Sequence, residues 1–65
     1  MMKFTFTLSN GMTYTEEFDS PADFIVAQLA DFDVLPDEGK IIDLEVAGEK
    51  LSFEGTILDL YNKYA

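Results

Sequence analysis

Carboxylates are the only chemically versatile side chains that this sequence holds in quantity. Its 65 residues include thirteen Asp and Glu and four Lys, but no His, Cys or Arg. Without His or Cys, the common pairs of nucleophile and general base cannot form, and without Arg there is no bidentate clamp for phosphate. We therefore expect a protein that is not an enzyme, with no catalytic or cofactor-binding residues, no metal ligands and no cofactor.

Asp43 and Glu54 are the carboxylates whose expected positions come closest to an acid–base pair. Both belong to segments that should form a hairpin, in which they would face each other across neighbouring strands. Such a pair can do acid–base chemistry where water is excluded. These two fall on the side assigned to solvent, with Lys50 nearby, so we interpret them as a solvated edge.

A second group of carboxylates has the composition of a calcium loop but not its spacing. The acidic residues are Asp31, Asp33, Asp37 and Glu38. A helix–loop–helix calcium site has acidic residues at positions one, three and five before a glycine at six. Counting back from Gly39 gives Val34, Pro36 and Glu38 instead. We interpret the segment as a polar loop.

Residues 3–9 and 13–18 alternate between apolar and polar side chains, which predicts a β-hairpin. A two-residue loop at Asn10-Gly11 would divide the large side chains between two faces. A three-residue loop, residues 9–11, with Gly11 left-handed in a bulge, gathers them on one face. Its pairs are Phe6 with Tyr14 and Met2 with Phe18, and we prefer this register.

The preferred register has one unexplained consequence, which concerns Glu16. Its side chain would point toward the apolar face, opposite Phe4. We interpret it as an edge position from which the carboxylate can reach water.

Residues 20–23, Ser-Pro-Ala-Asp, predict the start of a helix. The Ser20 hydroxyl can cap it, Pro21 has no amide hydrogen to leave unsatisfied, and Asp23 suits the positive end of the helix dipole. The helix should span residues 21–31, followed by a loop over 33–39. Its expected apolar stripe consists of Ala22, Ile25, Val26, Leu29 and Phe32.

Residues 41–46 and 50–53 predict two further strands. A two-residue loop at Gly48-Glu49 collects their apolar side chains by pairing Val46 with Leu51 and Leu44 with Phe53. Thr56 can cap a final helix, in which Ile57, Tyr61 and Tyr64 recur at helical spacing.

The predicted element order is ββαββα, in one small globular α+β domain over residues 1–65. If the first helix is a right-handed crossover that joins strand one to a parallel strand three, the four strands form a mixed sheet in the order 2-1-3-4. Both helices would then pack on one face of the sheet, and the other face would be open.

Most of the chain resembles ubiquitin-like β-grasp domains. The resemblance rests on Leu44-x-Val46-Ala47-Gly48-x-x-Leu51 followed by Thr56-x-Leu58-Asp59-x-Tyr61-Asn62, after a hairpin and a helix. It implies an alternative sheet with a central last strand. The chain stops at Ala65 without that strand and without a terminal Gly-Gly, so conjugation to other proteins is not implied.

Charge and size restrict the expected partners. The net charge is −9, and nucleic acids and anionic membranes are bound through clustered Lys and Arg. A partner attracted over a distance would be a basic protein. A domain of this size is marginally stable, so a homodimer is a second expectation. The lack of Cys and the short apolar runs favour the cytoplasm.

The open sheet face is the candidate interaction surface. Its proposed contact residues are Thr5, Thr7, Thr15, Glu17, Asp43, Glu45 and Glu54, with Thr13, Ile41 and Ser52 beside them. The alternative interpretation is the solvated side of an antiparallel sheet, which is what such alternation usually indicates.

The leading hypothesis is a protein-interaction or adaptor module of uncharacterised specificity. The alternative is an acidic mimic of nucleic acid, of the kind found among phage or mobile-element inhibitors, and acids spread evenly over the surface would count against it. A large buried cavity lined by Glu16 and Tyr14 would instead favour a small-ligand binder.

Overall fold

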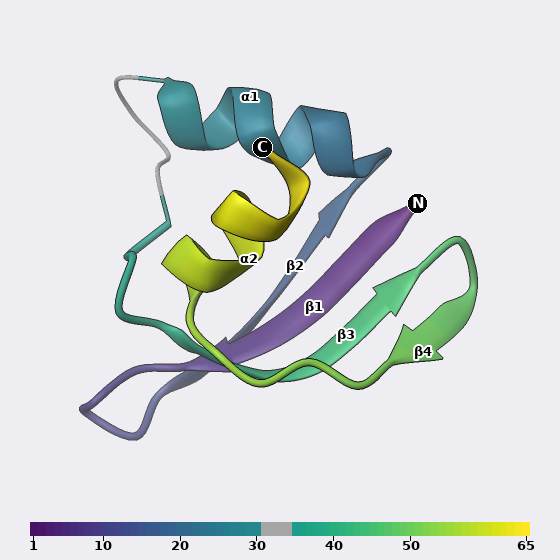
Figure 1. Ribbon diagram of the computed structural model, residues 1–65. Coiled ribbons are helices and arrows are strands. Elements are labelled where there is room, and N and C mark those ends of the chain that lie inside the picture. The colour runs from purple at the N-terminus through teal and green to yellow at the C-terminus, as the bar shows by residue number, and fades with distance from the viewer. Residues whose placement is uncertain (31–34) are drawn as a thin grey trace.

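Two helices lie over one face of a four-stranded sheet (Figure 1). The computed structural model describes residues 1–30 and 35–65. The elements are β1 (Met2–Thr7), β2 (Thr13–Phe18), α1 (Pro21–Leu29), β3 (Lys40–Val46), β4 (Glu49–Leu51) and α2 (Ile57–Tyr64). The predicted α+β class and the order ββαββα are confirmed.

The sheet is antiparallel throughout, so the predicted mixed sheet is wrong, although the strand order β2-β1-β3-β4 is as expected. The chain leaves β2 at Phe18, which pairs with Met2. It re-enters the sheet at Lys40, which pairs with Thr7 at the other end of β1. β3 is therefore parallel to β2 and antiparallel to β1. The prediction overlooked that β2 had already reversed the chain before the crossover began.

The β1–β2 hairpin has the predicted register and the predicted three-residue loop. Phe6 lies opposite Tyr14. The Gly11 N–H donates to the Leu8 carbonyl at 2.9 Å, and Gly11 has a φ of 83°. This left-handed residue closes the loop and gives the register that puts the large side chains on one face.

A β-bulge in β3 exchanges the roles predicted for two isoleucines. Thr5 pairs with Asp43 while Phe6 pairs with Ile41, so Ile42 is an extra residue on β3. Ile41 turns into the core with 3% of its surface exposed, whereas Ile42 is 55% exposed. The prediction that Ile41 lies on the open face is wrong, because regular alternation does not anticipate the bulge.

The β3–β4 hairpin turns one residue earlier than predicted. Ala47 and Gly48 have φ values of 55° and 81°, the two positive values that a type I′ loop requires. The predicted loop at Gly48-Glu49 is wrong: the turn is at Ala47-Gly48, although alanine is an unfavourable residue at positive φ. The observed pairs are Val46 with Glu49 and Leu44 with Leu51, in place of Val46 with Leu51 and Leu44 with Phe53. The register moves by two residues, so each side chain keeps its predicted face.

Helix α1 begins as predicted. The Ser20 hydroxyl accepts a hydrogen bond from the Asp23 N–H at 3.4 Å, and Pro21 occupies the first turn. Ala30 forms the C-cap after the helix ends at Leu29. The predicted end at residue 31 and the first part of the predicted loop lie outside the described residues.

The face that α1 buries differs from the predicted stripe. Phe24 is fully buried, whereas Val26 and Leu29 are 67% and 68% exposed. Ala22 is also exposed, and Ile25 alone among the described stripe residues packs against the core; Phe32 lies outside the described residues. Phe24 occupies the core position because an aromatic side chain buries more apolar area than the smaller residues of the stripe.

Helix α2 is held by a capping box and by two buried side chains. The Asp59 N–H donates to the Thr56 hydroxyl at 3.3 Å, and the Thr56 N–H donates to the Asp59 carboxylate at 2.9 Å. Ile57 and Leu60 are fully buried. Within residues 1–30 and 35–65, no helix is long and apolar enough to cross a membrane.

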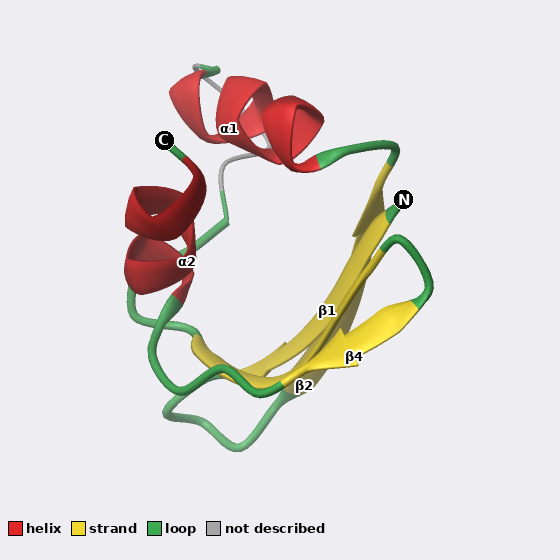
Figure 2. Cartoon of the chain, turned by 45° about the vertical axis from the view of Figure 1, so that its right-hand side comes forward, coloured by secondary structure: helices red, strands yellow, loops and turns green. Residues whose placement is uncertain are grey.

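Both helices lie on the concave side of the curved sheet (Figure 2). The core between these two layers contains Met2, Phe4, Phe6, Phe24, Ile41, Leu44, Ile57 and Leu60. The opposite face of the sheet is left to solvent, as predicted.

Gly39 is buried where the chain passes between the sheet and α2. Its N–H donates to the Pro36 carbonyl at 3.1 Å, and its carbonyl accepts from the Ile57 N–H at 2.8 Å. A Cβ at this position would lie 2.8 Å from Cδ2 of Phe6. Only glycine permits so close an approach.

Gly39→Ala is therefore expected to lower the free energy of unfolding by about 1–3 kcal/mol, because the added methyl overpacks the core. Urea denaturation measures the change. In a Phe6→Leu background the ring is gone and the cost of Gly39→Ala should shrink. An equal cost in both backgrounds would contradict the clash.

Ala47→Asn is expected to raise the free energy of unfolding by about 1 kcal/mol, because asparagine tolerates the left-handed conformation that alanine resists. Glu49→Asn is the matched control, since Glu49 belongs to the alternative loop. Thermal unfolding of the two variants decides between the loops: stabilisation by Glu49→Asn alone would refute the observed turn.

Candidate binding edge

The outer face of the sheet, which carries the predicted contact residues, is balanced in charge. One row runs across the four strands: Glu17 on β2, Lys3 on β1, Glu45 on β3 and Lys50 on β4. Each carboxylate is therefore next to a lysine, and such cross-strand neighbours stabilise a sheet. The Asp43 Oδ2 atom also lies 3.7 Å from the Lys50 Nζ atom. The face is polar rather than strongly acidic.

Threonines occupy the rows beside these charges. The Thr5 and Thr15 hydroxyls share a hydrogen bond of 2.9 Å, and the Thr7 hydroxyl donates to the Met12 carbonyl at 3.1 Å. The structure thus brings the predicted contact residues together on one face, apart from Glu54, which follows β4. Because these groups largely satisfy one another, the face has the character of the solvated side of an antiparallel sheet. Its role as a contact surface stays a prediction.

The predicted pairing of Asp43 with Glu54 is wrong. The strand pairing ends with Leu44 opposite Leu51, so Glu54 lies beyond it. In the acidic loop, Asp37 and Glu38 are exposed, and Asp31 and Asp33 lie outside the described residues. No cluster in the described part of the chain could hold a metal ion.

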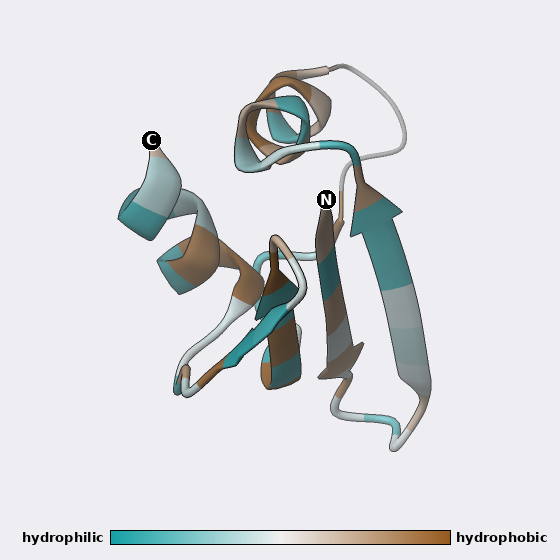
Figure 3. Ribbon diagram, turned by 90° about the vertical axis from the view of Figure 1, so that its right-hand side faces the viewer, coloured by the Kyte–Doolittle hydropathy of each residue, from teal (hydrophilic) through white to brown (hydrophobic). Residues whose placement is uncertain are grey.

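Strand β2 is an edge of the sheet, and its outer side has no partner strand among the described residues. The Leu8 N–H donates to the Met12 carbonyl at 2.9 Å, which sets the alternation of hydrogen bonds along the hairpin. Tyr14, Glu16 and Phe18 bond to β1, and Thr13, Thr15 and Glu17 direct their N–H and C=O groups outward. Figure 3 shows this outer strand as mostly hydrophilic along its length, next to the alternating β1.

The two edges of the sheet differ in their capacity to accept another strand. The β4 edge has only three residues, Glu49–Leu51, and short charged strands are protected edges. The β2 edge has six residues, none of them proline or lysine. β2 is therefore the edge with enough regular backbone to pair.

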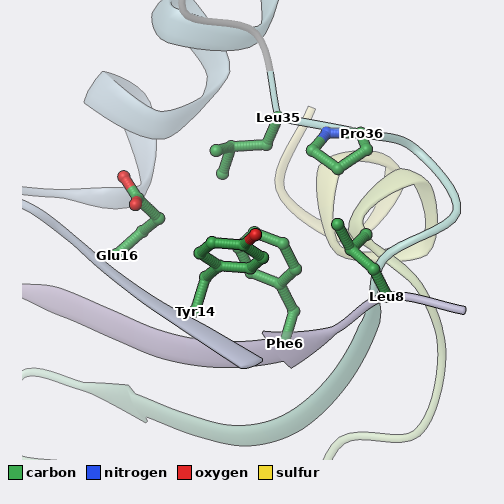
Figure 4. Close-up of a pocket in the computed structure, with 6 residues that line it drawn as sticks. All are labelled: Phe6, Leu8, Tyr14, Glu16, Leu35 and Pro36. Atoms are coloured by element: carbon green, nitrogen blue, oxygen red, sulfur yellow. The ribbon is translucent and has the colours of Figure 1, made fainter. Parts of the chain in front are cut away.

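A small open notch lies on the helix side of β2 (Figure 4). Its volume is about 230 Å³, and its lining residues are Phe6, Leu8, Tyr14, Glu16, Leu35 and Pro36. The rings of Phe6 and Tyr14 stack in the middle of the notch, with centroids 5.6 Å apart. The Glu16 carboxylate stands at one end, and Leu8 and Pro36 lie at the other. The notch is an apolar trough with one acidic end.

One wall of the notch is held in place by Gln28 from α1. The Leu35 N–H donates to the Gln28 Oε1 atom at 3.0 Å, and the Gln28 Nε2 atom donates to the Leu35 carbonyl at 3.3 Å. This side chain satisfies both backbone groups of Leu35 as a neighbouring strand would. Gln28 therefore fixes Leu35 over the rings of Phe6 and Tyr14.

Comparison with known proteins agrees with this fold. A family model described as a domain of unknown function, DUF4649, matches residues 3–64. The chain belongs to the DUF4649 family. It is also similar to the crystal structure of a conserved domain protein from Streptococcus pneumoniae TIGR4, with 25% identity and a TM-score of 0.83 over 97% of this chain and 86% of that chain. The comparison with curated proteins gave no match.

The ubiquitin-like resemblance remains a local one. Neither the DUF4649 description nor that of the solved structure is ubiquitin-like. The resemblance implies a central last strand, but in the described residues β1 and β3 pair directly and form the centre of the sheet. The order 2-1-3-4 is therefore the correct one of the two that the sequence left open.

The distribution of charge along the DUF4649 chain is a signal for the β2 edge that sequence reasoning missed. Residues 4–39 hold eight of the thirteen carboxylates and no lysine. This segment supplies β2 and α1, whereas the lysines lie on the other strands and on α2. The edge at β2 is therefore the acidic side of the fold, although the outer face next to it is balanced.

Gln28→Ala is expected to lower the free energy of unfolding by about 1–3 kcal/mol, because it leaves two half-buried backbone groups of Leu35 unpaired. Gln28→Glu keeps the acceptor for the Leu35 N–H and loses only the donor, so its cost should be smaller. Urea denaturation gives both values, and amide exchange reports on Leu35. Unchanged exchange at Leu35 in Gln28→Ala would show that the clamp does not hold this wall.

Proposed function

We propose that this DUF4649 chain is a non-enzymatic protein-interaction module that binds an extended segment of a partner protein along the β2 edge. The observation that carries the proposal is the coincidence of a regular unpaired edge with an apolar notch directly beside it. Added strands gain affinity from main-chain hydrogen bonds and specificity from pockets that take alternate side chains. Here β2 supplies the main-chain groups, and the notch supplies the pocket.

The size and lining of the notch favour a side chain of a protein partner over a separate small ligand. A volume of about 230 Å³ is below the range of about 300–1,000 Å³ that is typical of small-molecule sites. The notch is lined by Glu16 and Tyr14 but is open, not a large buried cavity. The absence of His, Cys and Arg from the sequence supports a binding role for the site.

Charge favours a basic partner over a second copy of this chain. Each copy carries a net charge of −9, so pairing two β2 edges brings two acidic surfaces together. A homodimer is therefore the competing outcome. Sedimentation at low and high salt distinguishes a dimer from a monomer that binds a basic partner. We place the interaction in the cytoplasm, because the sequence has no Cys and only short apolar runs.

The acidic-mimic alternative requires a run of carboxylates spaced like phosphates. The outer face shows the opposite, because lysines alternate with carboxylates in the row from Glu17 to Lys50. Main-chain pairing at the β2 edge, rather than a stripe of carboxylates on the outer face, is the better supported basis for recognition.

Thr15→Pro is expected to weaken binding at the β2 edge at least tenfold while preserving the fold. The Thr15 N–H points away from β1, so proline removes a donor that only an added strand would use. The assay selects heptapeptides from a random display library on the wild-type chain and measures their affinities. Amide shifts in NMR spectra locate the bound peptides.

Thr15→Val is the matched control, because it also loses the hydroxyl bond to Thr5 yet keeps the N–H. We expect at least a tenfold loss of affinity in Thr15→Pro and a small change in Thr15→Val, since one main-chain bond and the edge geometry are removed only in the first. Circular dichroism confirms folding. Selected peptides that bind all three chains equally, or that shift amides elsewhere and not in β2, would overturn the proposal.

A further inference from the structure

We propose that the notch selects a lysine or arginine side chain of the added strand, with Glu16 as its counter-ion. This inference rests on the proposed function, since it assumes that a strand pairs with β2. It names the chemistry of the partner: an extended segment with a long basic side chain on the face directed toward the helices.

The geometry of strand addition brings a side chain to the mouth of the notch. Tyr14 and Glu16 project from β2 on the helix side of the sheet, as their lining of the notch shows. Side chains that lie directly opposite across a strand pair share one face, with Cβ atoms about 4.5–5.5 Å apart. A partner residue opposite either position would therefore project beside the stacked rings.

The chemistry of the walls matches a side chain that is apolar along its length and charged at its tip. Phe6, Leu8, Leu35 and Pro36 supply apolar surface, and the Tyr14 ring offers a face over which a cation can lie. Lys and Arg bury their methylene stems on such surfaces while the charged group stays at a polar end. The Glu16 carboxylate is that end.

The remainder of the chain leaves Glu16 available for such a partner. Among the described residues Glu16 has no ion-pair partner. Lys3, the nearest lysine in the sheet order, lies opposite Glu17 and therefore on the other face. An acidic side chain in the notch would be repelled by Glu16, and an aliphatic one would partly desolvate the carboxylate without bonding to it. Both competitors are disfavoured for reasons that do not apply to a cation.

Protection of the β2 edge against unwanted strand pairing is a second role that fits Glu16, and the test must separate it from recognition. An inward-pointing charge on an edge strand discourages unwanted strand pairing. Protection alone requires a charge at this position but predicts no preference among bound peptides. Selectivity for basic side chains is therefore the distinguishing observation.

The experiment selects the random heptapeptide library separately on the wild-type chain, on Glu16→Gln and on Glu17→Gln. Glu17→Gln is the matched control, because it removes the same charge from the neighbouring residue on the opposite face. We expect peptides from the wild-type chain and from Glu17→Gln to be enriched in Lys or Arg at one position. Glu16→Gln should lose that enrichment.

A second measurement needs no variant and so remains valid if Glu16→Gln aggregates. The best selected peptide is remade with norleucine or glutamate in place of its enriched basic residue. Affinity for the wild-type chain should fall by about ten- to hundredfold, the worth of a hydrogen bond to a charged group.

The outcomes separate the two proposals. Peptides that shift the β2 amides but show no basic preference, or that tolerate norleucine, would overturn the role of Glu16 and leave strand addition standing. A basic preference that survives in Glu16→Gln would also overturn the role of Glu16. Peptides that bind without shifting the β2 amides would overturn the proposed function itself.

Discussion

Phe4 lies at the centre of β1 and contacts three other aromatic rings. Its ring centroid is 5.4 Å from that of Phe24, 6.0 Å from that of Phe18 and 6.2 Å from that of Phe6. These contacts join the first hairpin to α1 and bury a large apolar area for so short a chain. They also fix which face of β2 looks toward the helices. Glu16, directly opposite Phe4, is thereby held at the margin of the core and beside the notch.

The elements that could be predicted were those whose signals are local. Asn10-Gly11 and the alternation around it defined the first hairpin, and Ser20 and Thr56 marked the starts of both helices. The errors arose where several residues could do the same task. Either Ile41 or Ile42 could have entered the core, and only the bulge decided between them. The buried face of α1 depended on Phe24 meeting two rings from the hairpin, which no spacing within the helix reveals.

The candidate site was harder to predict, because its parts are far apart in the sequence. The notch is lined by residues 6, 8, 14, 16, 35 and 36, and Gln28 holds one wall. Sequence reasoning identified Glu16 as unexplained but directed attention to the outer face, where the Thr and Glu residues stood out by their alternation. Tertiary contact supplies the missing information: on that face the carboxylates meet lysines, whereas Glu16, on the helix side of β2, lies opposite Phe4. The lysine-free stretch over residues 4–39 was the one signal available beforehand.

The placement of the lysines gives the molecule a permanent electric dipole in addition to its net charge. Three of them lie on β1, β3 and β4 and the fourth on α2, while the β2–α1 side carries Glu16, Glu17, Asp19 and Asp23. If the partner is cationic, as proposed, its field would exert a torque on this dipole and turn β2 toward it before any contact is made. Orientation in the encounter complex would raise the association rate, and mobile ions would weaken the effect over a Debye length of about 8 Å at physiological salt. In the proposed complex, long-range charge would govern how often partners meet, and the contacts at β2 and the notch would govern how long they stay.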